Sequence, residues 1–237
     1  MALPKINESP KYKVTVPSTG KQVFYRPFYV KEQKVLLMAM EAQDQELVLK
    51  AMVDTIVSCV ESDLDIESLA TFDVEYLFTK IRAKSVGETS TIILNCTECE
   101  HGNEYTLNLE NIDMEIPGNL PNITLNDKFT LQMRYPKYTS MLESFKDKKD
   151  MTMTDLMFSM AIESLDKLLT EEEIINFDDE SAEEKIAFLD NLNTDQFNQI
   201  VEFVQALPKL EHLIEFQCES CNHENKQTLS GIQDFFS

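Results

Sequence analysis

Two cysteine pairs that lie far apart in the chain constrain its fold more than any other feature. Each pair has the spacing Cys-x2-Cys, and the residues that follow repeat as well. Cysteine, histidine, asparagine, threonine and leucine recur at the same offsets: Cys96, Cys99, His101, Asn103, Thr106 and Leu107 correspond to Cys218, Cys221, His223, Asn225, Thr228 and Leu229. Each copy lies between two β-prone runs, so the sequence predicts two hairpins that carry the thiols at their tips.

The four paired cysteines suit a metal ion. The N-terminus, MALPKINESPKY, lacks the charged and apolar regions of a signal peptide, so we expect a reducing cytosol in which thiols stay free. Four thiolates in two such pairs are typical of a closed, structural Zn²⁺ site. The predicted zinc ligands are Cys96, Cys99, Cys218 and Cys221. His101 and His223 could replace a cysteine, but with four thiolates present we expect them to pack or hydrogen-bond near the turn.

The separation of the two pairs is unusual. Residues 100–217, 118 in all, lie between them, whereas a zinc ribbon has about one or two dozen. Folding of the intervening chain must favour closure of so long a loop, and zinc would then join distant parts into one compact unit. Thiol redox chemistry is the alternative. Two copies of the motif argue against it, as do Glu98, Glu100 and Glu219, whose charges would raise the thiol pKa values.

Hydrophobic periodicity predicts an α+β protein that is mostly helical, with short antiparallel hairpins and a zinc-ribbon-like pair of knuckles. The expected segments are an N-terminal hairpin arm (1–30), a helical region (31–88), a β-rich region with the first knuckle (89–135), a helical insertion (136–208), and the second knuckle with the C-terminus (209–237).

Local signals place the first elements. A Pro-Ser-Thr-Gly turn within 11–28 predicts a hairpin. Apolar residues spaced by three and four between 30 and 60 predict a helical face that buries Cys59 as a small core residue rather than a reactive thiol. The apolar pattern from Phe72 to Ile81 predicts another helix, which Asp73 is placed to cap and Ser85-Val86-Gly87 ends.

Further signals follow along the chain. Alternation about Asn126-Asp127 predicts a hairpin over 123–133. The motif S/T-x-x-E, at Thr170–Glu173 and Ser181–Glu184, predicts two helix starts, and Leu168 is expected on a helical face. Residues 212–216 should form a strand.

Composition excludes several functions. Forty-two acids against 21 bases give a net charge of −21, which opposes binding to nucleic acid and to anionic membranes. Five glycines without phosphate-loop spacing and only three histidines leave little material for nucleotide or acid–base catalysis. We therefore expect no catalytic residues, and partners that are proteins.

Several stretches are similar to a known family. These are LPKINESPKYKVTVPSTGKQVFYRPF, VKEQKVLLMAME, the Cys59-Val60 pair and FDVEYLFTKIRAKSVGE before the first cysteine pair. Together, over about residues 1–110, they resemble baseplate proteins of T4-type contractile-tailed bacteriophages, in particular the small baseplate hub assembly proteins. The resemblance implies a non-enzymatic protein that helps to build the baseplate hub in the host cytoplasm, as an assembly factor or as a minor virion component, and that binds other hub proteins. It also implies that the Phe24–Phe28 hairpin and the Asp73–Glu88 helix are characteristic surfaces.

Two other functions remain open. A zinc-ribbon regulatory adaptor could bind a host protein, with its acidic surface mimicking nucleic acid. The chain could also be an enzyme, such as a thiol oxidoreductase or a metal hydrolase; a metal ligated entirely by thiolates, with no exchangeable water, would exclude this function.

Overall fold

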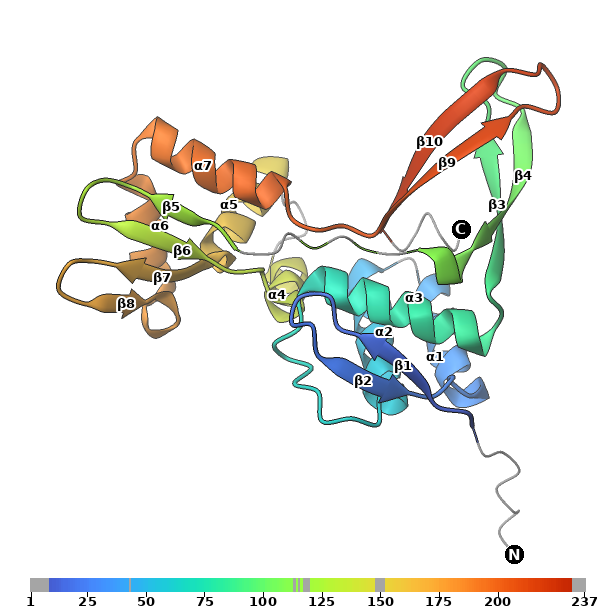
Figure 1. Ribbon diagram of the computed structural model, residues 1–237, viewed down its shortest axis with the longest axis horizontal. Coiled ribbons are helices and arrows are strands. Elements are labelled where there is room, and N and C mark those ends of the chain that lie inside the picture. The colour runs from blue at the N-terminus through green and yellow to red at the C-terminus, as the bar shows by residue number, and fades with distance from the viewer. Residues whose placement is uncertain are drawn as a thin grey trace, which may run out of the picture. The chain divides into compact units, whose positions relative to one another are not determined.

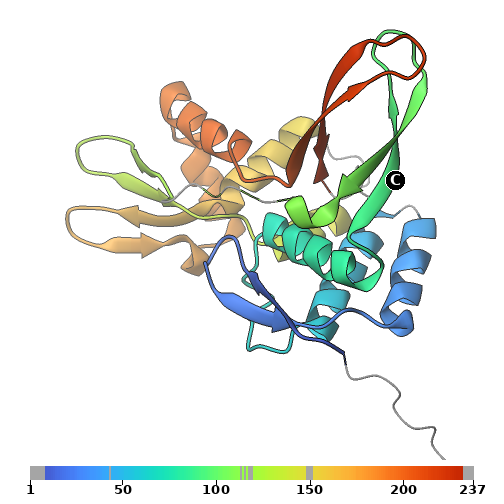
Figure 2. The same cartoon turned by 45° about the vertical axis from the view of Figure 1, so that its right-hand side comes forward.

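The computed structural model describes residues 9–42, 44–112, 114, 116, 120–147 and 152–231 (Figures 1 and 2). Within these ranges the chain forms seven α-helices and ten strands, which pair into four antiparallel sheets. The α+β class is confirmed, but the expectation of a mostly helical protein is overstated. None of the described helices is both long and apolar enough to cross a membrane.

Two compact units make up the chain. One comprises Met1–Ile66, Phe72–Glu115 and Lys209–Ser237, and the other comprises Glu67–Thr71 and Ile116–Pro208. The elements assigned to the first are β1 (Tyr12–Thr15), β2 (Gln22–Tyr25), α1 (Val30–Glu41), α2 (Gln45–Cys59), α3 (Thr71–Ser85, from Phe72 on), β3 (Thr89–Asn95), β4 (Gly102–Asn108), η1 (Leu109–Asn111), β9 (Glu211–Gln217) and β10 (Glu224–Ser230).

The predicted N-terminal hairpin is present. Strands β1 and β2 pair in antiparallel register, and the Val16 N–H closes their turn by donating to the Lys21 carbonyl at 2.8 Å. Gly20 has a φ of +67°, a left-handed conformation that glycine adopts without steric cost. The turn lies against α3, because Asp73 on that helix accepts hydrogen bonds from the Ser18 N–H (2.9 Å) and hydroxyl (2.6 Å).

Asp73 therefore does not cap α3, and that prediction is wrong. The helix begins at Thr71, so Asp73 lies within its first turn and is fully buried. A buried carboxylate needs hydrogen-bond donors, and the hairpin turn supplies them.

Two helices lie between residues 30 and 60, α1 (Val30–Glu41) and α2 (Gln45–Cys59). Asp44 caps α2, where its carboxylate accepts from the Glu46 and Leu47 N–H groups. The predicted apolar face of α2 is buried, and Cys59 at its end is fully shielded from solvent.

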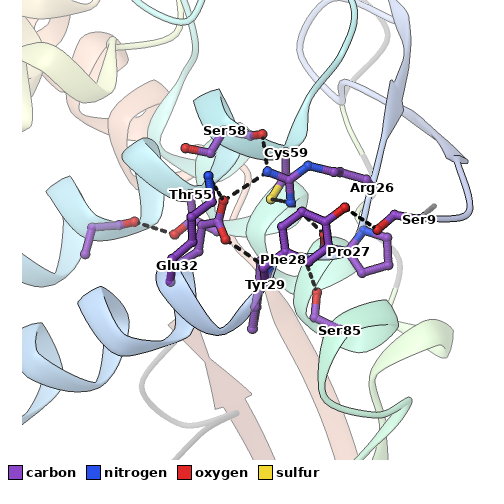
Figure 3. Close-up of polar contacts among 12 residues, drawn as sticks. Ser9, Arg26, Pro27, Phe28, Tyr29, Glu32, Thr55, Ser58, Cys59 and Ser85 are labelled. Carbon is purple, nitrogen blue, oxygen red and sulfur yellow. Dashed lines mark hydrogen bonds and ion pairs between the residues drawn. The ribbon is translucent and has the colours of Figure 1, made fainter. Parts of the chain in front are cut away.

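A buried ion pair connects the hairpin to both helices (Figure 3). Arg26, which follows β2, places Nη2 at 2.9 Å from Glu32 Oε1 on α1. The same guanidinium donates to the carbonyls of Ser58 and Pro27 at 2.8 Å and lies 4.4 Å from the Tyr29 ring centroid. The other Glu32 oxygen accepts the Tyr29 N–H at 2.9 Å and so caps α1.

These hydrogen bonds determine the ionisation of Glu32, whose exposed fraction is 6%. Burial alone would raise its pKa, but the bonds from Arg26 and from the Tyr29 N–H outweigh burial and lower the pKa below its ordinary value. Glu32 is therefore a charged group that favours the folded state.

The second unit has its own core. Its elements are β5 (Asn122–Thr124), β6 (Thr130–Met133), α4 (Tyr138–Asp147), α5 (Met153–Glu163), β7 (Leu165–Leu169), β8 (Ile174–Asn176), η2 (Phe177–Asp179), α6 (Ala182–Asp190) and α7 (Thr194–Gln205). Strands β5 to β8 form one antiparallel sheet in chain order. Helices α5, α6 and α7 pack against it through Ala161, Leu189 and Ile200, which share a buried cluster with Leu131 and Leu168.

Several local predictions in this unit can be compared with the structure. The hairpin over 123–133 is confirmed, and Ser181 with Glu184 forms the predicted capping box of α6. The helix start at Thr170 is wrong, because Thr170 lies in the turn between β7 and β8, where it bonds Glu173. Leu168 likewise lies on a strand, not on a helical face.

We expect Arg26→Met to destabilise the fold by about 3–5 kcal/mol, because the buried Glu32 would lose its closest cation and keep only the exposed Lys31. Denaturant unfolding at pH 7 measures this difference. Lys11→Met is the control: it removes an exposed ion pair with Glu61 and should cost less than about 1 kcal/mol. Equal losses in the two variants would contradict the role given to Arg26.

The lowered pKa of Glu32 also predicts a pH dependence. Its stabilising contribution is complete above its unfolded-state pKa, about 4.3, and is lost as the pH falls through the lower folded-state value. The stability difference between wild type and Glu32→Gln should therefore be largest near pH 7 and should shrink in acid. A difference that stays constant down to about pH 3 would argue against this assignment.

Candidate metal centre

Both predicted hairpins are present, with a cysteine pair at the tip of each. Asn95 faces Gly102 at the end of the β3–β4 ladder, and Gln217 faces Glu224 at the end of the β9–β10 ladder. Figures 1 and 2 show the two tips side by side, although residues 109–210 separate the hairpins in the chain.

The two tip loops have the same backbone conformation. In the first, the Cys96 N–H donates to the His101 carbonyl (2.9 Å) and the Glu100 N–H donates to the Cys96 carbonyl (3.0 Å). In the second, Cys218 donates to His223 and Asn222 donates to Cys218, both at 2.9 Å. Glu100 and Asn222, each directly after the second cysteine, have φ values of +58° and +59°. The repeat in sequence is thus a repeat in structure.

The four sulfur atoms converge at the place where the loops meet. All lie within 4.8 Å of one another. The distance from Cys96 Sγ to Cys221 Sγ is 3.7 Å, and that from Cys99 Sγ to Cys218 Sγ is 3.6 Å. Sulfurs about 2.3 Å from a tetrahedral Zn²⁺ would be about 3.8 Å apart, whereas a disulfide is about 2.05 Å. The cluster is therefore able to hold a metal ion.

The first cysteine of each pair is buried, and its thiolate is favoured. Burial alone would raise the pKa of Cys96. Backbone N–H groups of Cys99 and Glu98 and the Asn225 amide outweigh burial and lower it to about 6. The pKa of Cys218 is also lowered, because N–H groups of its own loop outweigh its burial.

The second cysteine of each pair is exposed and shows the opposite shift. The His101 N–H favours the Cys99 thiolate, but the nearby sulfurs of Cys218 and Cys96 outweigh it and raise the pKa. The same repulsion overcomes the His223 N–H and raises the pKa of Cys221 to about 12. Four thiolates this close need a cation to neutralise them, and tetrahedral four-sulfur sites in proteins hold zinc or iron.

Two buried asparagines cross from one hairpin to the other. Asn225 on β10 accepts from the Thr97 N–H (2.9 Å) and hydroxyl (3.0 Å) of the first loop. Asn103 on β4 accepts from the Glu219 N–H (2.8 Å) of the second loop. Each also donates to the carbonyl of the histidine in its own loop, His101 or His223. The asparagines therefore bind together the two loops that carry the sulfurs.

The repeated leucines complete the contact between the hairpins. Leu107 and Leu229 are buried in one cluster with Ile92 on β3 and Ile214 on β9. This cluster also includes Ala83 on α3, which connects the hairpin pair to the helical part of the unit.

The sequence pattern identifies the cysteines as ligands but does not reveal the role of Asn103 and Asn225. The available signal was their repetition: a polar residue recurs at the same offset in both copies of the motif. His101 and His223 are exposed and lie outside the sulfur cluster. Their hydrogen bonds described above come from backbone groups near the turn, whereas the expectation concerned their side chains.

We expect one metal ion per chain in the purified protein. Elemental analysis gives the stoichiometry, and Co²⁺ substitution should produce thiolate charge-transfer bands of a tetrahedral site. Cys99→Ser should lose the metal and melt at a lower temperature, because metal binding contributes directly to folding. Cys59→Ala is the matched control, since Cys59 lies outside the cluster, and it should retain the metal. A metal-free protein whose melting does not respond to chelator would refute the site.

The crossing asparagines give a second prediction. Asn225→Ala and Asn103→Ala each remove the acceptor of a hydrogen bond that joins the two loops, which costs about 0.5–1.5 kcal/mol. Metal affinity should fall about 10- to 100-fold, as it does when groups that orient ligands are removed. Competition with a chromophoric chelator measures the affinity. Asn198→Ala, at an exposed position on α7, should change neither quantity; unchanged affinity in all three variants would contradict the role of the crossing bonds.

Most of the chain matches a known protein family. Residues 9–237 match the family model described as T4 bacteriophage base plate protein. No curated protein and no solved structure matches significantly.

Proposed function

Because the chain belongs to the T4 bacteriophage base plate protein family, we propose that it is a non-enzymatic protein of the baseplate hub that binds other hub proteins. It acts either as an assembly factor or as a minor component of the finished hub. Family membership makes the chain a phage baseplate protein, and its partners are then other baseplate proteins. The hub is the more specific part of the proposal, and it rests on the sequence resemblance of residues 1–110.

The observation that carries the proposal is the extent of the family match. It covers residues 9–237, so it includes both cysteine pairs and the whole second unit. The resemblance noted from the sequence stopped near residue 110, before the second pair. The match thus places the entire cysteine cluster within the region that the family shares.

The metal in this proposal is structural Zn²⁺, held by Cys96, Cys99, Cys218 and Cys221. The sulfur spacing of 3.6–3.7 Å supports this ion, since the expected spacing is about 3.8 Å. A set of four thiolates closes the coordination sphere and leaves no position for a substrate or a reactive water. The centre therefore braces the protein and has no catalytic role.

The net charge of −21 supports protein partners over nucleic acid or anionic lipid. In this proposal the protein works in the host cytoplasm while the tail is built. Its presence in the virion then depends on whether it is released after assembly.

Quantitative mass spectrometry of purified virions and of infected-cell lysate tests the proposal. A tagged copy, expressed during infection, captures the partners. We expect hub proteins in the captured fraction: enrichment of the chain in particles identifies a hub component, and abundance in lysate alone identifies an assembly factor. The Cys99→Ser variant should capture less of each partner than Cys59→Ala does. Capture of a host protein without any tail protein would favour the regulatory adaptor instead.

A further inference from the structure

The outer edge of strand β1 has unused backbone hydrogen-bonding groups. The Val16 N–H donates to Lys21, and hydrogen-bonded pairs alternate along an antiparallel ladder. The N–H and C=O groups of Lys13 and Thr15 therefore point away from β2. Among the described residues, none forms a hydrogen bond with them.

The opposite edge of this sheet is already covered. On β2, the Phe24 carbonyl accepts from the Glu61 N–H and the Phe24 N–H donates to the Ser62 hydroxyl, both at 2.9 Å. Unpaired strand edges attract further strands, and proteins usually cover or block them. In this two-stranded sheet, the part of the chain that the structure describes covers the β2 edge and leaves the β1 edge unpaired.

A cavity of about 380 Å³ lies along β1. Its walls come from β1, β2, α3 and Glu110, and it contains three tyrosine side chains, Tyr12, Tyr25 and Tyr76. The Tyr12 and Tyr25 ring centroids are 5.7 Å apart. Binding cavities commonly combine such an apolar surface with a few polar groups, and this volume suits one or two side chains of an added strand.

Among the residues that line the cavity, basic side chains outnumber acidic ones, although the chain is strongly acidic. Lys13, Lys80 and Lys84 line it against a single carboxylate, Glu110. Lys84 pairs with Glu110 and with Glu88, and Lys80 donates to the Glu110 carbonyl at 2.8 Å. Within the described ranges Lys13 forms no ion pair and no side-chain hydrogen bond. Its ammonium group is thus available to an incoming carboxylate, beside the unpaired edge.

We propose that β1 binds an extended, acidic segment of a partner protein as a third strand of the sheet. The segment's backbone bonds to Lys13 and Thr15, one of its carboxylates pairs with Lys13, and an apolar side chain enters among the tyrosines. This mode of recognition takes affinity from main-chain hydrogen bonds and specificity from alternate side chains. The inference deepens the proposed function, on which it rests for the source of the segment, by naming the chemistry of the partner.

A second copy of this chain fits the edge less well. Strand β1 reads Tyr-Lys-Val-Thr and contains no acid, so two copies would bring two ammonium groups and no carboxylate to the shared edge. The charge of the edge therefore favours a different, acidic segment.

Selection from a displayed library of random twelve-residue peptides tests this inference with the full chain as bait. We expect the enriched peptides to be β-prone and to carry Asp or Glu at a fixed position. By fluorescence anisotropy, Lys13→Glu should weaken their binding tenfold or more, and selection on that variant should enrich Lys and Arg instead. Lys128→Glu, with the same charge change at an exposed turn of the other unit, should leave binding unchanged.

A second measurement tests the backbone contact without altering the protein. Methylation of the peptide nitrogens that face β1 should abolish binding, whereas methylation of the alternate nitrogens should not. Thr15→Pro, which removes one outward N–H at a sheet edge where proline is tolerated, should weaken binding, with metal content as the check on folding.

Three results would overturn the inference. They are enrichment of peptides without acids, binding that survives both Lys13→Glu and N-methylation, and self-association in sedimentation that Lys13→Glu abolishes. The proposed function is tested separately. If the Lys13→Glu variant still captures every hub protein from infected cells, the binding role of the β1 edge is refuted and the hub role stands. If the tagged wild-type protein captures no hub proteins from infected cells, the hub role is refuted, whatever the peptide selection shows.

Discussion

The meeting of two hairpin tips is the contact on which the first unit depends. Four sulfurs and two buried amides hold together segments that 118 residues separate in the chain. Buried amides and close thiolates are costly without partners, so each tip is stable only against the other. The apolar cluster beneath them also contains Ile112 and Leu210. The chain therefore leaves the first unit and returns to it at neighbouring points of one core, which explains how a second unit with its own core can be inserted between the hairpins.

The helical part of the first unit is held by a different kind of contact. Arg26 and Glu32 connect the N-terminal hairpin to α1 and α2, and Asp73 connects its turn to α3. Charged groups in such places gain most when every donor and acceptor is satisfied, and here the carboxylates each accept at least two hydrogen bonds. This arrangement fixes the position of the hairpin, while no described residue pairs with the outer edge of β1.

Much of the fold and of the site was predictable because its signals are local or repeated. The hairpins, the burial of Cys59 and the cap at Ser181 follow from spacing alone, and the duplicated cysteine motif indicated that distant loops meet. The errors occur where one pattern fits two structures. Thr170 accepts the Glu173 N–H, as a helix cap would, but the motif closes a strand turn. In the sequence, Asp73 lies at the start of a helical pattern, as a helix cap would. In the structure it lies within the first turn of α3 and accepts hydrogen bonds from the N-terminal hairpin turn. The crossing bonds of Asn103 and Asn225 depend on how two hairpins approach each other, which no single segment encodes.

The contacts at the hairpin tips are reciprocal. Cys96 approaches Cys221 as Cys218 approaches Cys99, and Asn225 bonds the residue after Cys96 as Asn103 bonds the residue after Cys218. Such exchange of identical contacts is the definition of an isologous interface, the kind that relates two subunits of a symmetric dimer. One polypeptide thus contains, as two copies of a short hairpin, an approximate twofold axis that passes through its own sulfur cluster. A protein with this arrangement has the form of a dimer whose subunits are covalently joined, with the second unit as the linker.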